Sequence, residues 1–206
     1  MPNTEIAVLT VPEAASARRS IRRFKQEPID RADLDTIFET VRLAPSAFNV
    51  QPWRFIVVSD PALKAELSAA ANGQRQIASA PAVIVLYTDM AASLDVLEDA
   101  MHPDVPSDRR AKDVAGFRGN WASKTEDERE QWAAAQGNIA LGYLLLAAAA
   151  HGYATSPMLG FDPQKVKHAL GLPMHVRIPA LVAIGIADEE GFSHHRLSAD
   201  RLVTYR

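Results

Sequence analysis

Three short runs of β-branched and apolar residues constrain the fold more than any other feature of this chain. They cover residues 54–59 (RFIVVS), 82–88 (AVIVLYT) and 180–186 (ALVAIGI). Runs of this length and composition predict strands in the centre of a sheet. Helical patterns, several of them opened by an aspartate that can cap a helix, lie between the runs at 31–43, 61–71, 130–151 and 162–170. The chain is therefore predicted to mix α and β structure along its whole length.

Size and composition restrict the function classes. At 206 residues the chain fits one domain, which we place at 1–206. Its net charge of -3 gives no basic excess, so no nucleic-acid partner is expected. The absence of cysteine excludes disulfides, thiolate nucleophiles and thiolate metal sites, and it fits a reducing compartment. Redox chemistry would need a bound cofactor. The first ten residues lack the features of a signal peptide, which predicts a cytoplasmic protein.

Three segments leave alternatives open. Residues 133–150 are apolar enough to suggest a membrane span, but polar residues and glycines interrupt them, so a buried helix is the better interpretation. The charged stretch 95–130 contains Pro103 and Pro106 and predicts a helical excursion with loops, either a lid or a solvated insert. The last run, 202–206 (LVTYR), is strand-like and could pair with its own sheet or with a partner subunit.

A basic motif near the N-terminus has the pattern of an anion site. In extended backbone, Arg18, Ser20 and Arg22 project to the same side, whereas Arg19 and Arg23 would point the other way. Two guanidinium groups and a hydroxyl suit a phosphate dianion, because each guanidinium can donate two parallel bonds. A solvated basic patch is the alternative for this motif.

The segment 44–53 (APSAFNVQPW) precedes the first strand and is unusual for a connector. It combines two prolines, two small residues and two amide side chains: Pro45, Pro52, Ser46, Ala47, Asn49 and Gln51. The prolines favour non-helical backbone, and the small residues permit a flat ligand to approach closely. The segment could bind the edge of a heteroaromatic ring, or it could be a turn whose amides bond to local backbone.

Taken together, RRSIRRF at 18–24 and the 44–53 segment resemble the nitroreductase family of flavoproteins. Further similarity lies in 72–77 (NGQRQI), 156–162 (SPMLGFD) and Arg196-Leu197, so the resemblance spans nearly the whole chain. It implies an α+β, three-layer α/β/α fold with a mixed, mostly antiparallel sheet flanked by helices. It also implies an intertwined homodimer in which two FMN molecules lie at the subunit interface.

The resemblance assigns expected roles in FMN binding to four groups of residues. Those expected at the phosphate and ribityl end are Arg18, Arg19, Ser20, Arg22, His194 and Arg196. Those expected along the isoalloxazine, with contributions from the opposite subunit, are Pro45, Ser46, Ala47, Asn49 and Gln51. Asn72 and Arg75 match positions that reach the pyrimidine edge, where a guanidinium stabilises the charge of the reduced ring. Around the flavin N5, the matching positions are Pro157, Met158, Leu159 and Gly160, and a backbone N–H of Leu159 is expected to face N5.

The implied activity is transfer of hydride from NADH or NADPH through FMN to a nitroaromatic, a quinone or a related small-molecule acceptor, by a ping-pong mechanism. No catalytic side chain is expected, because the chemistry takes place at flavin N5. Phe117, Trp121 and Trp132 are candidates for the substrate face, with core packing as the alternative. Reductive dehalogenation, flavin fragmentation and flavin binding without catalysis remain as rival functions. No metal site is expected, because apart from His194-His195 the six histidines are scattered and no HExxH spacing occurs.

Overall fold

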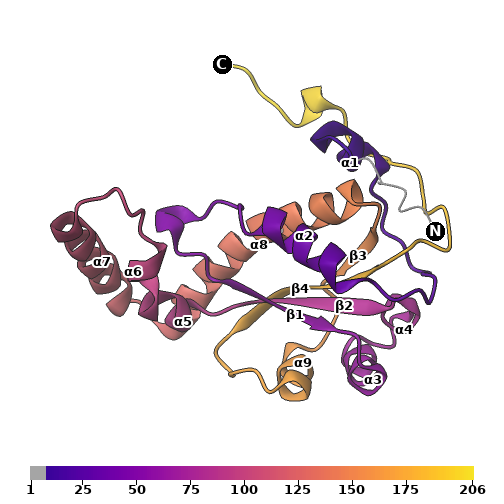
Figure 1. Ribbon diagram of the computed structural model, residues 1–206, viewed down its shortest axis with the longest axis horizontal. Helices are drawn as coiled ribbons and strands as arrows, with labels where there is room; N and C mark the ends of the chain where they lie inside the picture. Colours follow the sequence, from indigo (N-terminus) through magenta and orange to yellow (C-terminus); the bar gives the residue numbers. More distant parts are fainter. Residues whose placement is uncertain (1–7) are drawn as a thin grey trace.

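A four-stranded sheet forms the centre of the molecule (Figure 1). The computed structural model describes residues 8–206, and the spatial order of its strands is β1 (Trp53–Val58), β2 (Ala82–Thr88), β4 (Arg177–Gly185) and β3 (Ala154–Met158). Each neighbouring pair is antiparallel. An isolated parallel bridge joins Ser20 to Thr155. The predicted runs at 54–59, 82–88 and 180–186 thus correspond to β1, β2 and β4, but the first is not central, because β1 lies at an edge of the sheet.

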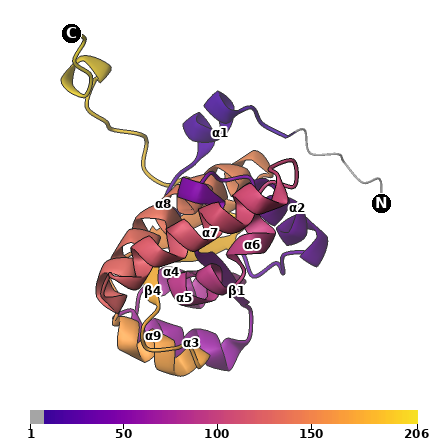
Figure 2. The ribbon, with the colours of Figure 1, turned by 90° about the vertical axis from the view of Figure 1, so that its left-hand side faces the viewer.

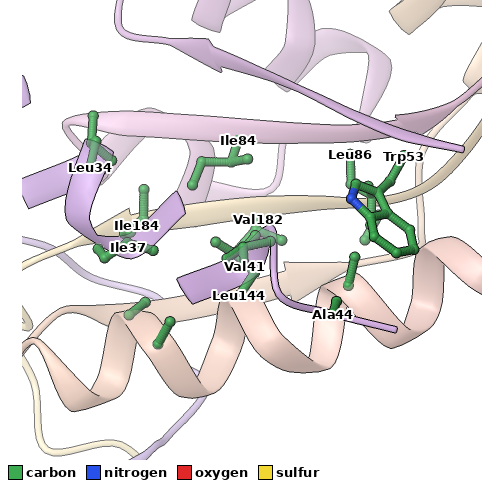
Figure 3. Packing of buried hydrophobic residues seen from close by; sticks show 14 of the residues in the cluster. Leu34, Ile37, Val41, Ala44, Trp53, Ile84, Leu86, Leu144, Val182 and Ile184 are labelled. Atoms are coloured by element: carbon green, nitrogen blue, oxygen red, sulfur yellow. The ribbon is translucent and has the colours of Figure 1, made fainter. Parts of the chain in front are cut away.

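Helices cover both faces of the sheet, which confirms the three-layer α/β/α arrangement. On one face, α2 (Arg31–Val41) and α8 (Glu126–Ala150) pack against Ile84 and Val182 (Figure 3). On the other, α3 (Pro61–Ala70) and α9 (Pro163–Leu170) pack with Val83 and Leu181. Successive residues of a strand face opposite sides, so a strand covered on both faces must be apolar throughout. This requirement explains why the central strands were visible in the sequence.

The charged stretch 95–130 lies at one end of the sheet, as the left side of Figure 1 shows. After α5 (Met90–Asp95) it comprises α6 (Leu97–Ala100), α7 (Ser107–Ala122) and the first turn of α8. A cluster that includes Val50, Phe117 and Trp121 packs beneath these helices, with Trp132 against it. For these aromatic residues, core packing is therefore the main role that the structure shows.

The other end of the sheet carries both described chain ends, with α1 (Val11–Ala17) and α4 (Arg75–Ser79) nearby. From residue 190 onward every residue is exposed, and the C-terminal segment extends away from the body of the molecule (Figures 1 and 2). The segment 202–206 does not pair with its own sheet, because it follows a short helical turn, η2 (Ala199–Arg201), and joins no strand of the described chain, so pairing with a partner subunit stays a prediction. An apolar, alternating sequence forms a strand only where a neighbour supplies hydrogen bonds.

Helix α8 is long and apolar enough to cross a membrane by length and composition. Its buried residues include Ala133, Ala140 and Leu144, and they pack in the clusters that join α8 to the sheet and to α7. This agrees with the expectation of a buried helix at 133–150. The helix begins earlier than predicted because Thr125 and Glu128 form a capping box.

The contact of α8 with the sheet gives a stability prediction. A Cβ at Gly137 would lie 2.8 Å from Cγ2 of Thr88 and 3.2 Å from Cγ of Pro179. Gly137→Ala is therefore expected to lower the free energy of unfolding by about 1–3 kcal/mol through overpacking. Gly119→Ala, in open space on α7, is the control and should be neutral or raise it by up to about 1 kcal/mol. Chemical denaturation at equal protein concentration compares the two, and equal stabilities would contradict the packing.

Candidate functional site

Basic residues from two distant segments meet in one small pocket. The pocket has a volume of about 160 Å³, and its lining consists of Arg18, Arg19, Ser20, Arg22, Phe192, Ser193, His194 and Arg196. Every residue predicted for the FMN phosphate is among them. The Ser20–Thr155 bridge holds one segment against β3, and the carboxylate of Glu189 accepts a hydrogen bond from the Arg22 backbone N–H at 2.6 Å.

The pocket has the electrostatics of an anion site. Partial burial, followed by repulsion from Arg196 and Arg19, lowers the pKa of Arg18. No acidic side chain lines the pocket. Gly191 has φ of +69°, and a Cβ there would lie 2.8 Å from Cδ1 of Ile21, so glycine allows residues 192–196 to lie close over the basic motif. A bound dianion would relieve the repulsion, and the donor set fits a phosphate.

The alternation expected in the basic motif holds only in part. Arg23 leaves the pocket and pairs with Asp188 at 2.9 Å. The expectation that Arg19 points away is wrong, because Arg19 also lines the pocket, with its Nη1 donating to the Ser16 and Arg18 carbonyl oxygens. The segment makes a single bridge to β3 instead of a regular ladder, so strict side-chain alternation does not apply to it.

The 44–53 segment forms a strained loop before β1. Phe48, Asn49 and Gln51 all have positive φ, with values of 54°, 54° and 44°. Such a conformation costs energy for residues other than glycine and is concentrated at functional sites. The loop contains a short 3₁₀ helix, η1 (Ala47–Asn49), and the Gln51 N–H donates to Oγ of Ser46 at 2.9 Å. Pro45, Ser46 and Ala47 form its entry.

Both amide side chains of this loop donate to backbone within the chain. Nδ2 of Asn49 donates to the Ala100 carbonyl at 2.6 Å, and Nε2 of Gln51 donates to the Asn49 carbonyl at 3.1 Å. Local bonding, one of the two alternatives for these residues, is thus present for both. Gln136 of α8 accepts from the Ala47 N–H at 3.0 Å. These bonds tie the loop to α6 and α8, and Ala47 remains exposed.

Phe48 was not singled out by the sequence argument, although it lies inside the motif. Its side chain is 69% exposed, and its ring centroid is 4.7 Å from that of Phe117. Both rings border a pocket of about 880 Å³ between the loop and α7. Phe48 stands out because it is an exposed aromatic residue with positive φ. The backbone angle is known only from the structure.

Residues 72–75 and 157–160 contact each other, and Met158 pairs with Leu181 opposite the middle of β2. Nε2 of Gln74 donates to the Gly160 carbonyl at 2.9 Å, and Nδ2 of Asn72 donates to the same oxygen at 3.4 Å. Asn72 has φ of 57°. Arg75 and Leu159 are both exposed. Helix α4, which begins at Arg75, is joined to the basic motif because Oγ of Ser79 donates to the Arg22 carbonyl at 3.3 Å.

The basic pocket and the 44–53 loop therefore lie at opposite ends of the sheet. Ser20 bridges Thr155, whose partner Ile184 pairs with Ala82, the first residue of β2. The strained loop leads into Trp53, which pairs with Thr88, the last residue of β2. A strand rises about 3.3 Å per residue, so the groups are about 20 Å apart along β2. One chain does not bring the basic pocket and the strained loop together.

Similarity to known proteins decides the family. The Nitroreductase family model matches residues 15–186. The chain belongs to the nitroreductase family. Among its relatives, a protein of Thermus thermophilus named NADH dehydrogenase is 45% identical over 201 residues, which cover 98% of each chain.

Solved structures share the nitroreductase fold. A protein from Exiguobacterium sibiricum, described as a nitroreductase and solved in complex with FMN, has a TM-score of 0.87 and 27% identity. The match covers 98% of this chain and 100% of that one. An enone reductase of gut-bacterial fatty acid saturation matches with a TM-score of 0.85 and 26% identity, covering 97% and 99% of the two chains.

Proposed function

We propose that this member of the nitroreductase family is an FMN-dependent oxidoreductase that takes hydride from NADH or NADPH and passes it to an electron-poor acceptor. Nitroaromatics and quinones are the acceptor classes we expect. The convergence of Arg18, Arg22 and Arg196 on one phosphate-sized pocket carries the proposal. The FMN bound to a relative of the same fold supports it.

The phosphate end is assigned to the basic pocket. Arg18, Arg22 and Arg196 would donate charge-assisted bonds to the phosphate oxygens, and Ser20 would donate from its hydroxyl. Arg19 and His194 complete the lining. Because Oγ of Ser20 lies 3.5 Å from Nη1 of Arg18, one oxygen could be shared by both groups.

The ring end is assigned to the other predicted residues. When bound, FMN would supply an N5 atom that accepts and donates hydride. Asn72 and Arg75 would face the pyrimidine edge, where a guanidinium stabilises the negative charge of the reduced ring. The stretch Pro157, Met158, Leu159 and Gly160 would lie beside N5, with the Leu159 backbone N–H as donor. No side chain is assigned a proton-transfer role.

The substrate space is assigned to the pocket of about 880 Å³ beside the strained loop. Phe48 and Phe117 offer aromatic surface there, and Met101 and Val105 add apolar area. Arg109 and Lys112 of α7 line the same pocket. Flat, electron-poor molecules stack favourably on such rings. One open face would serve NAD(P)H and the acceptor in turn, which is the basis of a ping-pong mechanism.

A homodimer is part of the proposal, because the two groups of site residues are separated within one chain. In a dimer, the loop of Pro45, Ser46, Ala47, Asn49 and Gln51 from one subunit could meet the basic pocket of the other. The exposed C-terminal segment supports this, since apolar Phe192, Leu202 and Tyr205 have no cover in the described chain. An apolar groove of about 460 Å³ between α1 and α8 offers a surface for a second copy. We place the whole chain, 1–206, in one domain per subunit and expect a cytoplasmic protein with no membrane or nucleic-acid partner.

Anaerobic stopped-flow reduction tests the function. NADH or NADPH is expected to bleach the flavin absorbance of the holoprotein, and mixing with a quinone, a nitroaromatic, an enone or free flavin should restore it. Steady-state rates with the best acceptor should give parallel double-reciprocal lines. A colourless protein that cannot be reconstituted with FMN would exclude the proposal. Bleaching that no acceptor reverses would instead indicate a non-catalytic flavin-binding protein.

A further inference from the structure

Three ionisable side chains meet beneath α5 and α8, outside the residues assigned to FMN. Asp89, Glu130 and His175 each bring one ligand atom to within 4.8 Å of the other two. Asp89 follows β2 and caps α5, Glu130 lies near the start of α8, and His175 precedes β4. Asp89 and His175 are 86 residues apart in the sequence, so no local spacing reveals the cluster.

Glu130 presents a buried oxygen that lacks a partner. The residue is 2% exposed, and its Oε1 accepts a hydrogen bond from the Met90 N–H at 2.8 Å. Its Oε2 is fully buried and has no hydrogen-bond partner in residues 8–206. A buried carboxylate oxygen without a partner is costly, and such groups are usually paired with a charge or bound to a metal. Of the three residues of the cluster, Glu130 is the most deeply buried.

The nearby cations do not complete the cluster. Arg177 pairs with Asp127, and Nζ of Lys167 donates to the Met174 carbonyl at 2.7 Å. Across the described chain, neither side chain is hydrogen-bonded to Asp89, Glu130 or His175. A divalent cation would balance the negative charge of the two carboxylates, and the imidazole could offer it a nitrogen lone pair.

We propose that Asp89, Glu130 and His175 bind one divalent transition-metal ion, with Zn²⁺ as the best match. Nε2 of His175 lies 3.2 Å from Oδ1 of Asp89. Ligands about 2.0–2.1 Å from a tetrahedral Zn²⁺ are about 3.3 Å apart, so this pair already has the required separation. Imidazole favours Zn²⁺ over Mg²⁺ and Ca²⁺, which prefer all-oxygen sites. Water would take the fourth position.

The surroundings give the ion an access route and a structural role. His175 lines an open pocket of about 460 Å³ whose wall includes Glu126 and Asp127. The Asp89 N–H donates to the Pro52 carbonyl at 2.9 Å, directly after the strained loop. The ion would join the beginnings of α5, α8 and β4 and would stiffen the base of that loop. It would stabilise the fold without taking part in hydride transfer.

Metal binding is tested with holoprotein that has been treated with a chelator and desalted, using Zn²⁺ alone as the probe. Calorimetric titration and metal analysis after dialysis should give one Zn²⁺ per chain. Glu130→Gln, which keeps an oxygen for the Met90 N–H, and His175→Gln are each expected to weaken binding at least tenfold. His168→Gln, at an exposed position of α9, is the matched control and should bind Zn²⁺ like the wild type.

Two further measurements distinguish this site from binding elsewhere. X-ray absorption should show one nitrogen ligand with oxygen ligands, and Zn²⁺ should raise the melting temperature of the wild type and of His168→Gln only. If either variant loses FMN or its native circular dichroism spectrum, Asp89→Asn is tested in its place. Asparagine can still cap α5. Substoichiometric binding, or undiminished binding in Glu130→Gln and His175→Gln, would overturn the proposal. If both variants bound Zn²⁺ as tightly as the wild type, His194-His195 would be the next candidate for the Zn²⁺ site.

Discussion

Replacing Arg18 and Arg196 together with alanine is expected to weaken FMN binding at least a hundredfold. Both side chains line the basic pocket, and the pKa of Arg18 is lowered by burial and then by Arg196 and Arg19. A hydrogen bond to a charged group contributes about 1.5–3 kcal/mol, so losing two corresponds to about 10²–10⁴ in affinity. Quenching of flavin fluorescence during titration of the apoprotein measures the dissociation constant.

Riboflavin makes this test specific for the phosphate. Riboflavin has the ring and the ribityl chain but no phosphate, so the wild type should bind it far more weakly than FMN. The double variant should bind the two ligands with similar affinity, because the groups that recognise phosphate are gone. Arg31→Ala removes one positive charge from an exposed ion pair on α2 and should leave both affinities unchanged. An unchanged preference for FMN in the double variant would refute the assignment of the pocket.

The sequence predicted β1, β2 and β4, whose residues are mostly apolar, and missed β3. Strand β3 lies at an edge of the sheet and contains Thr155, Ser156 and Pro157, a composition that indicates a loop. Proline is tolerated at an edge strand, where one side of the ladder has no neighbour. The run at 202–206 has a strand-like pattern, but the described chain offers it no strand to pair with, and its pairing with a partner subunit stays a prediction.

The site was predicted as a set of residues but not as an arrangement. The order of the motifs along the chain does not give the distances between them. The sequence therefore does not show that Ser20 and Ser46 lie far apart. Their separation follows from strand register, which depends on long-range pairing such as Thr155 with Ile184. The cluster of Asp89, Glu130 and His175 was missed for the same reason. The sequence predicts no metal site, because its histidines show no ligand motif of short spacing.

Combining two defective chains in one dimer is expected to restore one FMN site. The first chain carries Arg18→Ala and Arg196→Ala and lacks the phosphate pocket. The second carries Ala47→Glu, which places a bulky charge at a small, exposed position of the ring-lining loop. Neither homodimer should bind FMN with wild-type affinity. The heterodimer, isolated through two different affinity tags, should bind one FMN tightly, whereas the wild-type dimer should bind two.

The count of tight sites separates shared sites from sites contained within one chain. If each site takes its phosphate pocket from one subunit and its loop from the other, both defects fall in one site of the heterodimer and the second site is intact. If each site came from a single chain, every site would carry a defect and none would recover. Two differently tagged copies of the Arg18 and Arg196 variant are the control and should show no tight site. Because the two groups lie about 20 Å apart along β2, recovery of one site is the outcome that the proposed homodimer predicts.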